Sequence, residues 1–239
     1  ATVVPMATAL GQSAPVYVVH NDAGSTTAFS SLNQGAGQVT RFGVNTPDAI
    51  ERLRFLRDVV GPVIGDAIAA RGPIDVLSLA AQGVPMGDDV HMRVQATTNL
   101  LLRDLLPYLV RSDVAGAPDA ATFLAANHLM FLNVAMAAAK ALVMWAEQVE
   151  HSSIVTTMAR NGTTYGLRLA GAPQWFLTES PPVQDALYYP GQGPETSAPD
   201  IGDSAVLELI GLGGAAAANS PAVAGFLGGR MSDAIAATR

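Results

Sequence analysis

"HLMFLNVAMAAAKALVMWAEQVE", residues 128–150, decides the fold, because it is a long apolar run without proline or glycine. A helix that is apolar on every side is buried in a protein core or spans a membrane. Asn133 and Lys140 interrupt the run, and a central lysine costs about 3 kcal/mol on membrane-insertion scales. We therefore interpret the stretch as the buried helix of a bundle and expect no membrane contact. Small residues allow neighbouring elements to approach it closely: Ala135, Ala137, Ala138, Ala139 and Ala141.

The sequence around this run, from residue 76 to residue 151, has helical periodicity. We expect one of its helices to begin near Asp88. Apolar side chains recur along one side of this helix at Val90, Val94, Thr97, Leu101, Leu105 and Leu109. Pro118 and Asp119 begin a shorter helix, since proline is tolerated in a first helical turn. Residues 76–151 are thus predicted to form a helical domain.

The segment before it, residues 1–75, begins with β signals. "VYVVHND", residues 16–22, is a short apolar run that ends in turn formers. "SLNQGAGQVTRFG", residues 31–43, places glycines between strand-like pieces, and we interpret the glycines mainly as turns. Thr46 and Pro47 then suit the cap and first position of a helix, which Gly61 and Pro62 should kink or split.

The segment after it, residues 152–239, changes period again. "SSIVTTMARNGTTYGLRLAG", residues 152–171, predicts a β-hairpin in which Asn161 and Gly162 favour a type I′ turn. A proline- and glycine-rich loop follows over residues 179–200, and glycine-interrupted helices follow from residue 201, the second of them opened by Ser220 and Pro221. The fold prediction is therefore α+β: a β-rich first segment, an inserted helical bundle and a second α/β segment.

Composition excludes several classes of function. The net charge of −7 and the lack of a basic run argue against a nucleic-acid binder. The chain has no cysteine, which excludes thiol catalysis, disulfides and cysteine-ligated zinc. The first residues lack the basic region of a signal peptide, and we expect a cytoplasmic protein.

The densest group of charges is "DDVHMR", residues 88–93. On a helix, Asp88 could orient the imidazole of His91, which would then act as a general acid or base. Arg93 could hold a carboxylate or phosphate through two hydrogen bonds. The alternative is a polar helix start without a ligand, since acidic residues favour that position.

Two further groups are candidates for binding an anionic substrate. Asn133 and Lys140 share a helical stripe with Glu147. Because a buried lysine needs an anionic partner, Lys140 pairs either with the carboxylate of Glu147 or with an anionic group of the substrate. Arg160 and Asn161 lie at the predicted hairpin tip, where the turn alone explains the asparagine.

"PDIGDS", residues 199–204, precedes an apolar helical run. Ser204 could cap that helix or help its N-terminus bind phosphate. Asp200 and Asp203, together with Glu195, could hold a magnesium ion. No other cofactor is indicated by the residues.

Six blocks in order resemble one family, the AllG/YlbE-like family. They are "RFG" (41–43), "MGDDVHMR" (86–93), "NHLMFLNVAMAAAKA" (127–141), "MARNGTTYGLRLAG" (158–171), "YYPGQGPE" (188–195) and "PDIGDSAVLELIGLGG" (199–214). Family members usually have glutamate and cysteine at the positions of Asp89 and Val90, asparagine at Met92 and an acidic residue at Thr164. They also extend further at both ends.

The resemblance implies a subunit of oxamate carbamoyltransferase, an enzyme of anaerobic allantoin catabolism and thus of purine degradation. The implied reaction converts oxalurate and phosphate to oxamate and carbamoyl phosphate. The implied partners are FdrA-like (AllF) and AllH-like subunits, and we expect a homo-oligomer or a complex because missing ends would leave apolar surface exposed. Two other functions stay open: a non-catalytic scaffolding subunit, and an amidohydrolase acting on a ureido or cyclic amide substrate.

Overall fold

The computed structural model describes residues 2–4, 8–180, 188, 190–197, 205–226 and 229–238. It confirms the α+β class. The strands are β1 (Val16–Asn21), β2 (Thr26–Ser31), β3 (Val155–Arg160), β4 (Thr164–Leu169) and β5 (Ala172–Glu179). The longer helices are α1 (Pro47–Phe55), α2 (Gly61–Arg71), α3 (Val76–Gly83), α4 (Gln95–Leu109), α5 (Ala117–Ala126), α6 (Met130–Ala146), α7 (Pro221–Phe226) and α8 (Met231–Thr238). Short π- or 3₁₀-helical turns are η1 (Leu56–Val60), η2 (Val84–Met86), η3 (Pro194–Thr196), η4 (Ala205–Ile210) and η5 (Gly213–Asn219).

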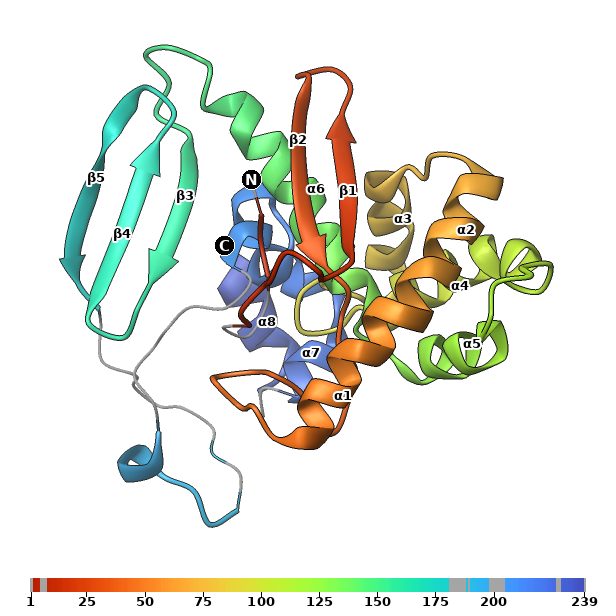
Figure 1. Cartoon of the computed structure of the whole chain (residues 1–239). Coiled ribbons are helices and arrows are strands. Elements are labelled where there is room, and N and C mark those ends of the chain that lie inside the picture. Colours follow the sequence, from red (N-terminus) through yellow and green to blue (C-terminus); the bar gives the residue numbers. More distant parts are fainter. Residues whose placement is uncertain are drawn as a thin grey trace.

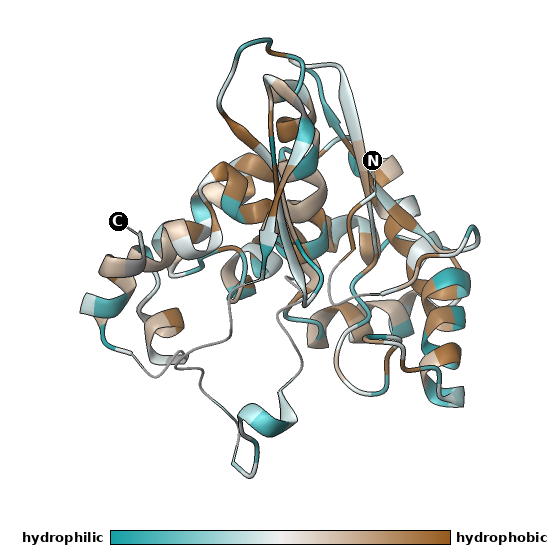
Figure 2. Cartoon of the chain, turned by 90° about the vertical axis from the view of Figure 1, so that its left-hand side faces the viewer, coloured by the Kyte–Doolittle hydropathy of each residue, from teal (hydrophilic) through white to brown (hydrophobic). Residues whose placement is uncertain are grey.

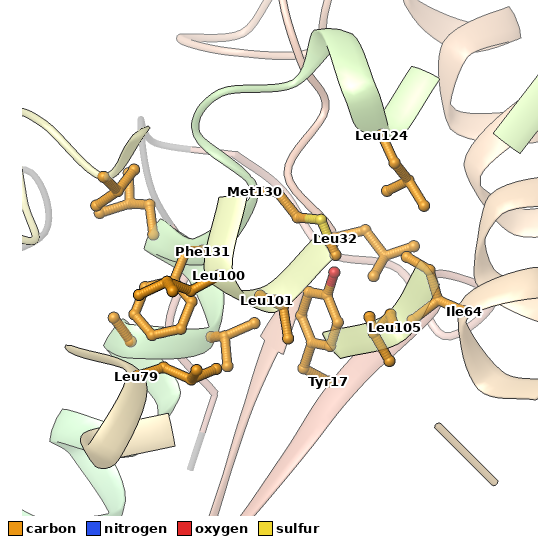
Figure 3. Close-up of a cluster of buried hydrophobic side chains, with 14 of the residues drawn as sticks. Tyr17, Leu32, Ile64, Leu79, Leu100, Leu101, Leu105, Leu124, Met130 and Phe131 are labelled. Carbon is orange, nitrogen blue, oxygen red and sulfur yellow. The ribbon is translucent and has the colours of Figure 1, made fainter. Parts of the chain in front are cut away.

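The apolar run that opened the sequence argument forms α6, which lies at the centre of the molecule (Figure 1). It packs against β1 and β2 on one side and against α3, α4 and η4 on others. Its small side chains are almost fully covered, as a buried bundle helix requires. The core around it draws residues from all three predicted segments, including Tyr17, Leu105, Phe131 and Leu207. Figure 3 shows part of this core, with Tyr17, Leu105 and Phe131 labelled. Burial raises the pKa of Tyr17 above its ordinary value. The three-domain division with boundaries at 75 and 151 stays a prediction.

Two separate antiparallel sheets flank this core. β1 and β2 form a hairpin, and β3, β4 and β5 form a three-stranded meander that stands to one side (Figure 1). The predicted hairpin at 152–171 is therefore confirmed. The strand β5 was not predicted, because "APQWFLTE" lacks an alternating pattern. Its residues from Gln174 to Glu179 are exposed on both faces.

The predicted cap at Thr46 is confirmed, whereas the predicted kink at Gly61 and Pro62 is replaced by a change of helix type. The hydroxyl of Thr46 accepts a hydrogen bond from the backbone N–H of Ala49 at 3.4 Å, and Pro47 is the first residue of α1. At Gly61 and Pro62 the chain does not leave the helical path. The π-helical turn η1 joins α1 to α2, so proline falls in a first turn, where its missing N–H is not needed. Figure 2 shows apolar and polar residues side by side on the helices, as in amphipathic helices.

The end of the chain has the predicted glycine-interrupted helices. The turns η4 and η5 are followed by α7, whose first residue is Pro221, and Ser220 precedes it as expected. In the part of the chain that the structure describes, no single helix is long and apolar enough to cross a membrane. Only α5 and α6 taken together reach that length, and they meet at an 81° bend.

Candidate functional site

Residues 88–93 form a turn before α4 rather than its first residues, which corrects the predicted helix start. Asp88 is completely buried, and its Oδ2 accepts hydrogen bonds from the backbone N–H of Thr97 at 2.7 Å and from its hydroxyl at 3.0 Å. Its Oδ1 accepts from the N–H of Ala96 at 3.2 Å and from the guanidinium of Arg93 at 2.5 Å. Asp88 therefore satisfies the open N–H groups of the first turn of α4 from a distance along the chain.

Asp89 closes the turn itself. Its carboxylate accepts hydrogen bonds from three successive backbone N–H groups, those of His91, Met92 and Arg93, at 3.0, 3.3 and 2.8 Å. Val90 lies inside this turn with φ +62° and is completely buried. A β-branched residue rarely adopts a left-handed conformation, so the surrounding hydrogen bonds hold a strained backbone in place.

His91 does not pair with Asp88, which corrects the predicted orientation of the imidazole. Both oxygens of the Asp88 carboxylate accept hydrogen bonds from Arg93 and from the first turn of α4. Instead, Nδ1 of His91 lies 2.7 Å from Oε1 of Glu208, and the two side chains are 19% and 27% exposed. Sequence reasoning missed Glu208, because no local signal links residues so far apart along the chain.

Glu208 is held in place by a second contact and by a glycine. Its Oε2 accepts a hydrogen bond from the N–H of Gly214 at 2.7 Å. A Cβ on Gly213 would overlap the carboxylate of Glu208, and this glycine has φ +65°. Its N–H donates to the carbonyl of Asp89 at 2.7 Å. The glycine pair in "IGLGG" therefore brings two distant sequence blocks into contact.

The guanidinium group of Arg93 is held by the protein at one nitrogen atom and is partly exposed to solvent. One nitrogen atom, Nη1, is held by Asp88, while a third of the side chain is exposed. Within the described residues, its other guanidinium nitrogens make no hydrogen bond. This geometry leaves donors for a carboxylate or phosphate at the surface of the turn.

Asn133 is placed in a buried polar network away from this turn. Its amide nitrogen donates to the carbonyl of Ser31 at 2.7 Å, and its amide oxygen accepts from the side chain of Asn33 at 2.9 Å. The amide of Asn127 donates to the carbonyl of Asn33 at 3.0 Å. These bonds join α6 to the end of β2 and engage both ends of the Asn133 amide. The glycine-rich loop was predicted as turns, and its buried asparagine was not anticipated.

Lys140 lies against the carboxylate that the sequence offered as its partner. Its Nζ is 3.4 Å from Oε1 of Glu147, and its side chain is only 17% exposed. As expected from its isolation on an apolar helix, the lysine is largely covered, and the ion pair accounts for its charge.

Arg160 ends β3, and Asn161 follows it in the turn. The side-chain oxygen of Asn161 accepts hydrogen bonds from the N–H of Thr163 at 3.0 Å and that of Thr164 at 2.7 Å. Asn161 does not have a positive φ, whereas Gly162 has φ +90°. Gly162 is therefore the first central residue, as in type II′ turns, and the predicted type I′ turn with Asn161 and Gly162 at its centre is wrong.

The residues predicted to bind a magnesium ion or a phosphate lie mostly outside the part of the chain that the structure describes. Asp200, Asp203 and Ser204 lie outside the described residues, and Glu195 lies exposed in η3. In the rest of the chain, as far as the structure describes it, no three histidine or carboxylate side chains gather in a way that could hold a metal ion.

The chain is similar to proteins of known sequence over nearly its whole length. It is 38% identical to the oxamate carbamoyltransferase subunit AllG of Escherichia coli (strain K12) over 94% of the chain and 54% of that protein. It is 36% identical to the uncharacterized protein YahG of the same strain over 92% of the chain and 47% of that protein. The chain thus spans about half the length of these curated relatives.

A solved structure has the same fold. It is the crystal structure of a conserved protein of unknown function from Enterococcus faecalis V583, which is 33% identical, with a TM-score of 0.92 over 99% of this chain and 57% of that one. Residues 1–204 also match the family described as oxamate carbamoyltransferase subunit AllG. Together with the ordered sequence blocks, this match establishes that the chain belongs to the AllG family.

Proposed function

We propose that the chain is part of a carbamoyltransferase subunit of the oxamate type, acting on oxalurate and phosphate. The observation that carries the proposal is a meeting of two family blocks. Residues 86–93 and the described part of the second block, residues 205–214, are far apart in sequence, and they come together through His91 and Glu208. Such a convergence of charged side chains at a partly exposed turn suits a small anionic substrate.

In this proposal Arg93 binds the substrate. Carbamoyl transfer requires the phosphate oxygen to attack the carbamoyl carbon, and negative charge then develops on the carbamoyl oxygen. The guanidinium donors that Asp88 leaves open can pair with the oxalurate carboxylate or the phosphate, and Asp88 fixes their direction. The role of Asp88 is to position Arg93 and α4.

His91 is the proposed proton-transfer residue, with Glu208 positioning it. When the carbon–nitrogen bond of oxalurate breaks, the departing oxamate nitrogen must gain a proton, which an imidazolium can supply. A carboxylate on Nδ1 fixes the orientation of the ring. The strained Val90 between Asp89 and His91 is consistent with a functional turn, because backbone strain is often kept at such sites.

The remaining candidates are peripheral to this proposal. Lys140, Arg160 and Ser204 are retained as possible contacts to a second anionic group, and Asp200 and Asp203 as magnesium ligands. The protein engages both ends of the Asn133 amide and the side-chain oxygen of Asn161. On the strength of the family resemblance we also propose assembly with FdrA-like (AllF) and AllH-like subunits in the cytoplasm, and a place in allantoin breakdown.

One observation favours a second candidate function. Within the described residues, every hydrogen bond that the buried carboxylate of Asp88 accepts comes from α4 or Arg93, as a purely structural turn would require. The chain would then be a scaffolding subunit that holds other subunits together. A third function, an amidohydrolase acting on a ureido or cyclic amide substrate, differs from the carbamoyltransferase in that its reaction needs no phosphate, and from the scaffolding subunit in that it has an activity.

The test uses the full-length protein with its partner subunits, assayed with oxalurate at several phosphate concentrations. A carbamoyltransferase yields oxamate only when phosphate is present, whereas a hydrolase yields it without phosphate. Arg93→Ala should weaken substrate binding by about 1.5–3 kcal/mol, the range for a charged hydrogen bond. Arg93→Lys should restore only part of it, because a lysine lacks the two-pronged geometry. Unchanged turnover in both variants would assign the turn to the scaffold.

A further inference from the structure

Among the described residues, β1 pairs along one edge only, with β2, and the hydrogen bonds of β2 reveal which residues of β1 face the other edge. The N–H of Val3 donates to the carbonyl of Phe29 at 2.8 Å, so this carbonyl points away from β1. Phe29 lies opposite Val18 in the hairpin. In an antiparallel ladder this makes Val18 and Phe29 a pair without mutual hydrogen bonds. Val16 and His20 alternate with Val18, so the N–H and C=O groups of all three face outward.

A cleft of about 610 Å³ lies along this open edge. It is lined by β1, the start of α3, α4 and α6, and among the described residues none of its lining belongs to β2. Its floor is apolar and buried, with Leu105, Met130 and Phe131 (Figure 3). Its volume is within the range of binding sites. At its mouth, Val18 and Leu77 are 51% and 40% exposed.

The walls of the cleft determine what kind of molecule fits. β1 lies between β2 and α3 (Figure 1), so the helix forms the wall opposite the open strand edge. Neighbouring strands in a sheet lie about 4.8 Å apart. A strand that paired with the free edge of β1 would therefore have β1 on one side and α3 on the other. A second hairpin or sheet brought to this edge would meet α3. A single extended segment can pair with Val16, Val18 and His20 while alternate side chains enter the apolar floor.

One end of the cleft is acidic. Asp22 and Asp75 both line it and both are exposed. Hydrogen bonds from Ser78 lower the pKa of Asp75 below its ordinary value, and both carboxylates are charged at neutral pH. Charge complementarity therefore favours a basic residue at the corresponding end of the extended segment.

We propose that the cleft between β1 and α3 is a docking site for one extended segment of a partner chain, which adds to the β1–β2 hairpin as a third strand. The segment is apolar at alternate positions and carries a lysine or arginine near Asp22 and Asp75. This inference does not depend on the proposed chemistry at residues 88–93.

The test is a selection followed by a binding measurement. A displayed library of decapeptides that alternate apolar and polar residues is selected on the full-length protein, and an enriched peptide is synthesised. We expect a shared basic residue at one end of the enriched peptides. On binding, hydrogen exchange should slow at the amides of Val16, Val18 and His20, while those of Tyr17 and Val19, already paired with β2, should change little.

Two variants keep the test specific. Val18→Pro removes an N–H that β2 does not use, so it should lower affinity at least tenfold, whereas Val18→Thr keeps the N–H and should bind as before. If Val18→Pro fails to fold, the double variant Asp22→Asn and Asp75→Asn replaces it, since asparagine still caps a helix. That variant should lose the preference for a basic residue and most of the salt dependence of binding.

Three results would overturn the proposal. The first is a selection in which no peptide distinguishes the wild type from Val18→Pro. The second is protection of the three amides in the isolated protein at every concentration, which would mean that the cleft is filled from within the same chain. The third is a dimer that Val18→Pro abolishes, which would assign the edge to a second copy.

Discussion

The turns at 88–93 and 161–164 use the same local chemistry but differ in how far their contacts reach. In the first turn, the carboxylate of Asp89 accepts hydrogen bonds from the backbone N–H groups that follow it. In the second turn, the side-chain oxygen of Asn161 does the same. The first turn also contains the buried Asp88 and contacts Glu208, whereas the contacts of Asn161 stay within its own turn.

The difference teaches that a cluster of polar residues in the sequence does not show whether its contacts stay within one turn or reach distant parts of the fold. The 161–164 turn can be explained by its own residues, so its amide needs no ligand. The 88–93 turn satisfies a helix, holds a strained Val90 and positions two ionisable side chains at the surface. If this contrast is real, substitutions in the two turns should have very different costs.

The largest effect is expected for Asp88→Ala. This change leaves Arg93 without its buried partner and exposes the open N–H groups of α4, and breaking a buried ion pair costs about 3–5 kcal/mol. The free energy of unfolding from urea denaturation measures it. Asp88→Asn keeps acceptor capacity for Thr97 and should lose less. A loss below about 1 kcal/mol for the alanine variant would remove the contrast with the second turn.

Gly213→Ala should come next, at about 1–3 kcal/mol, because its Cβ overlaps the carboxylate of Glu208. Gly211 provides a matched control. It also has a positive φ, +82°, but a Cβ there meets nothing within 4 Å. The difference in stability between the two alanine variants isolates the close approach from the backbone strain. Equal costs would show that Glu208 moves aside freely.

Asp75→Ala removes an exposed capping carboxylate, and its cost in stability can be compared with that of removing the buried carboxylate of Asp88. Asp75 caps α3 through the N–H of Ser78 at 3.0 Å, and loss of an N-cap costs about 1 kcal/mol. Because its pKa is lowered in the folded state, this contribution is present above the unfolded pKa of about 3.9 and is lost as the pH falls through the folded value. Denaturation of both proteins at neutral and acidic pH should show their stabilities converge in acid.

The smallest effect is expected for Asn161→Ala, about 0.5 kcal/mol, since water replaces hydrogen bonds at an exposed turn. Asn161→Asp keeps the accepting oxygen and should be nearly neutral. Thermal denaturation resolves such differences when the variants are compared side by side. A cost comparable to that of Asp88→Ala would contradict the contrast between the turns.

The local elements of the fold could be predicted because they depend on short-range patterns. The apolar run gave α6, the spacing of Val94, Leu101 and Leu105 gave the buried side of α4, and Thr46 gave the start of α1. The start of α4 was predicted too early, because its capping carboxylate comes from a preceding turn instead of the adjacent residue.

The site depended on contacts that no local pattern encodes. Charge density pointed to residues 88–93, but the partner of His91 is Glu208 and the partner of Asn133 is Asn33. Each pair joins segments about a hundred residues apart. The glycines of "IGLGG" were a usable signal, because paired glycines after a short helical turn often mark a close approach of backbone to another group.

The central claim is that His91 and Glu208 act as one unit in proton transfer, and a double-mutant cycle tests it most directly. Turnover of oxalurate is measured for the full-length assembly carrying His91→Gln, Glu208→Gln or both. We predict that His91→Gln lowers kcat about 10²-fold or more, as loss of a general acid does, with KM little changed. Glu208→Gln alone should lower kcat less, and the double variant should be no slower than His91→Gln. The account would be contradicted if the fold-losses in kcat of the two single variants multiplied in the double variant, or if all three variants kept wild-type turnover.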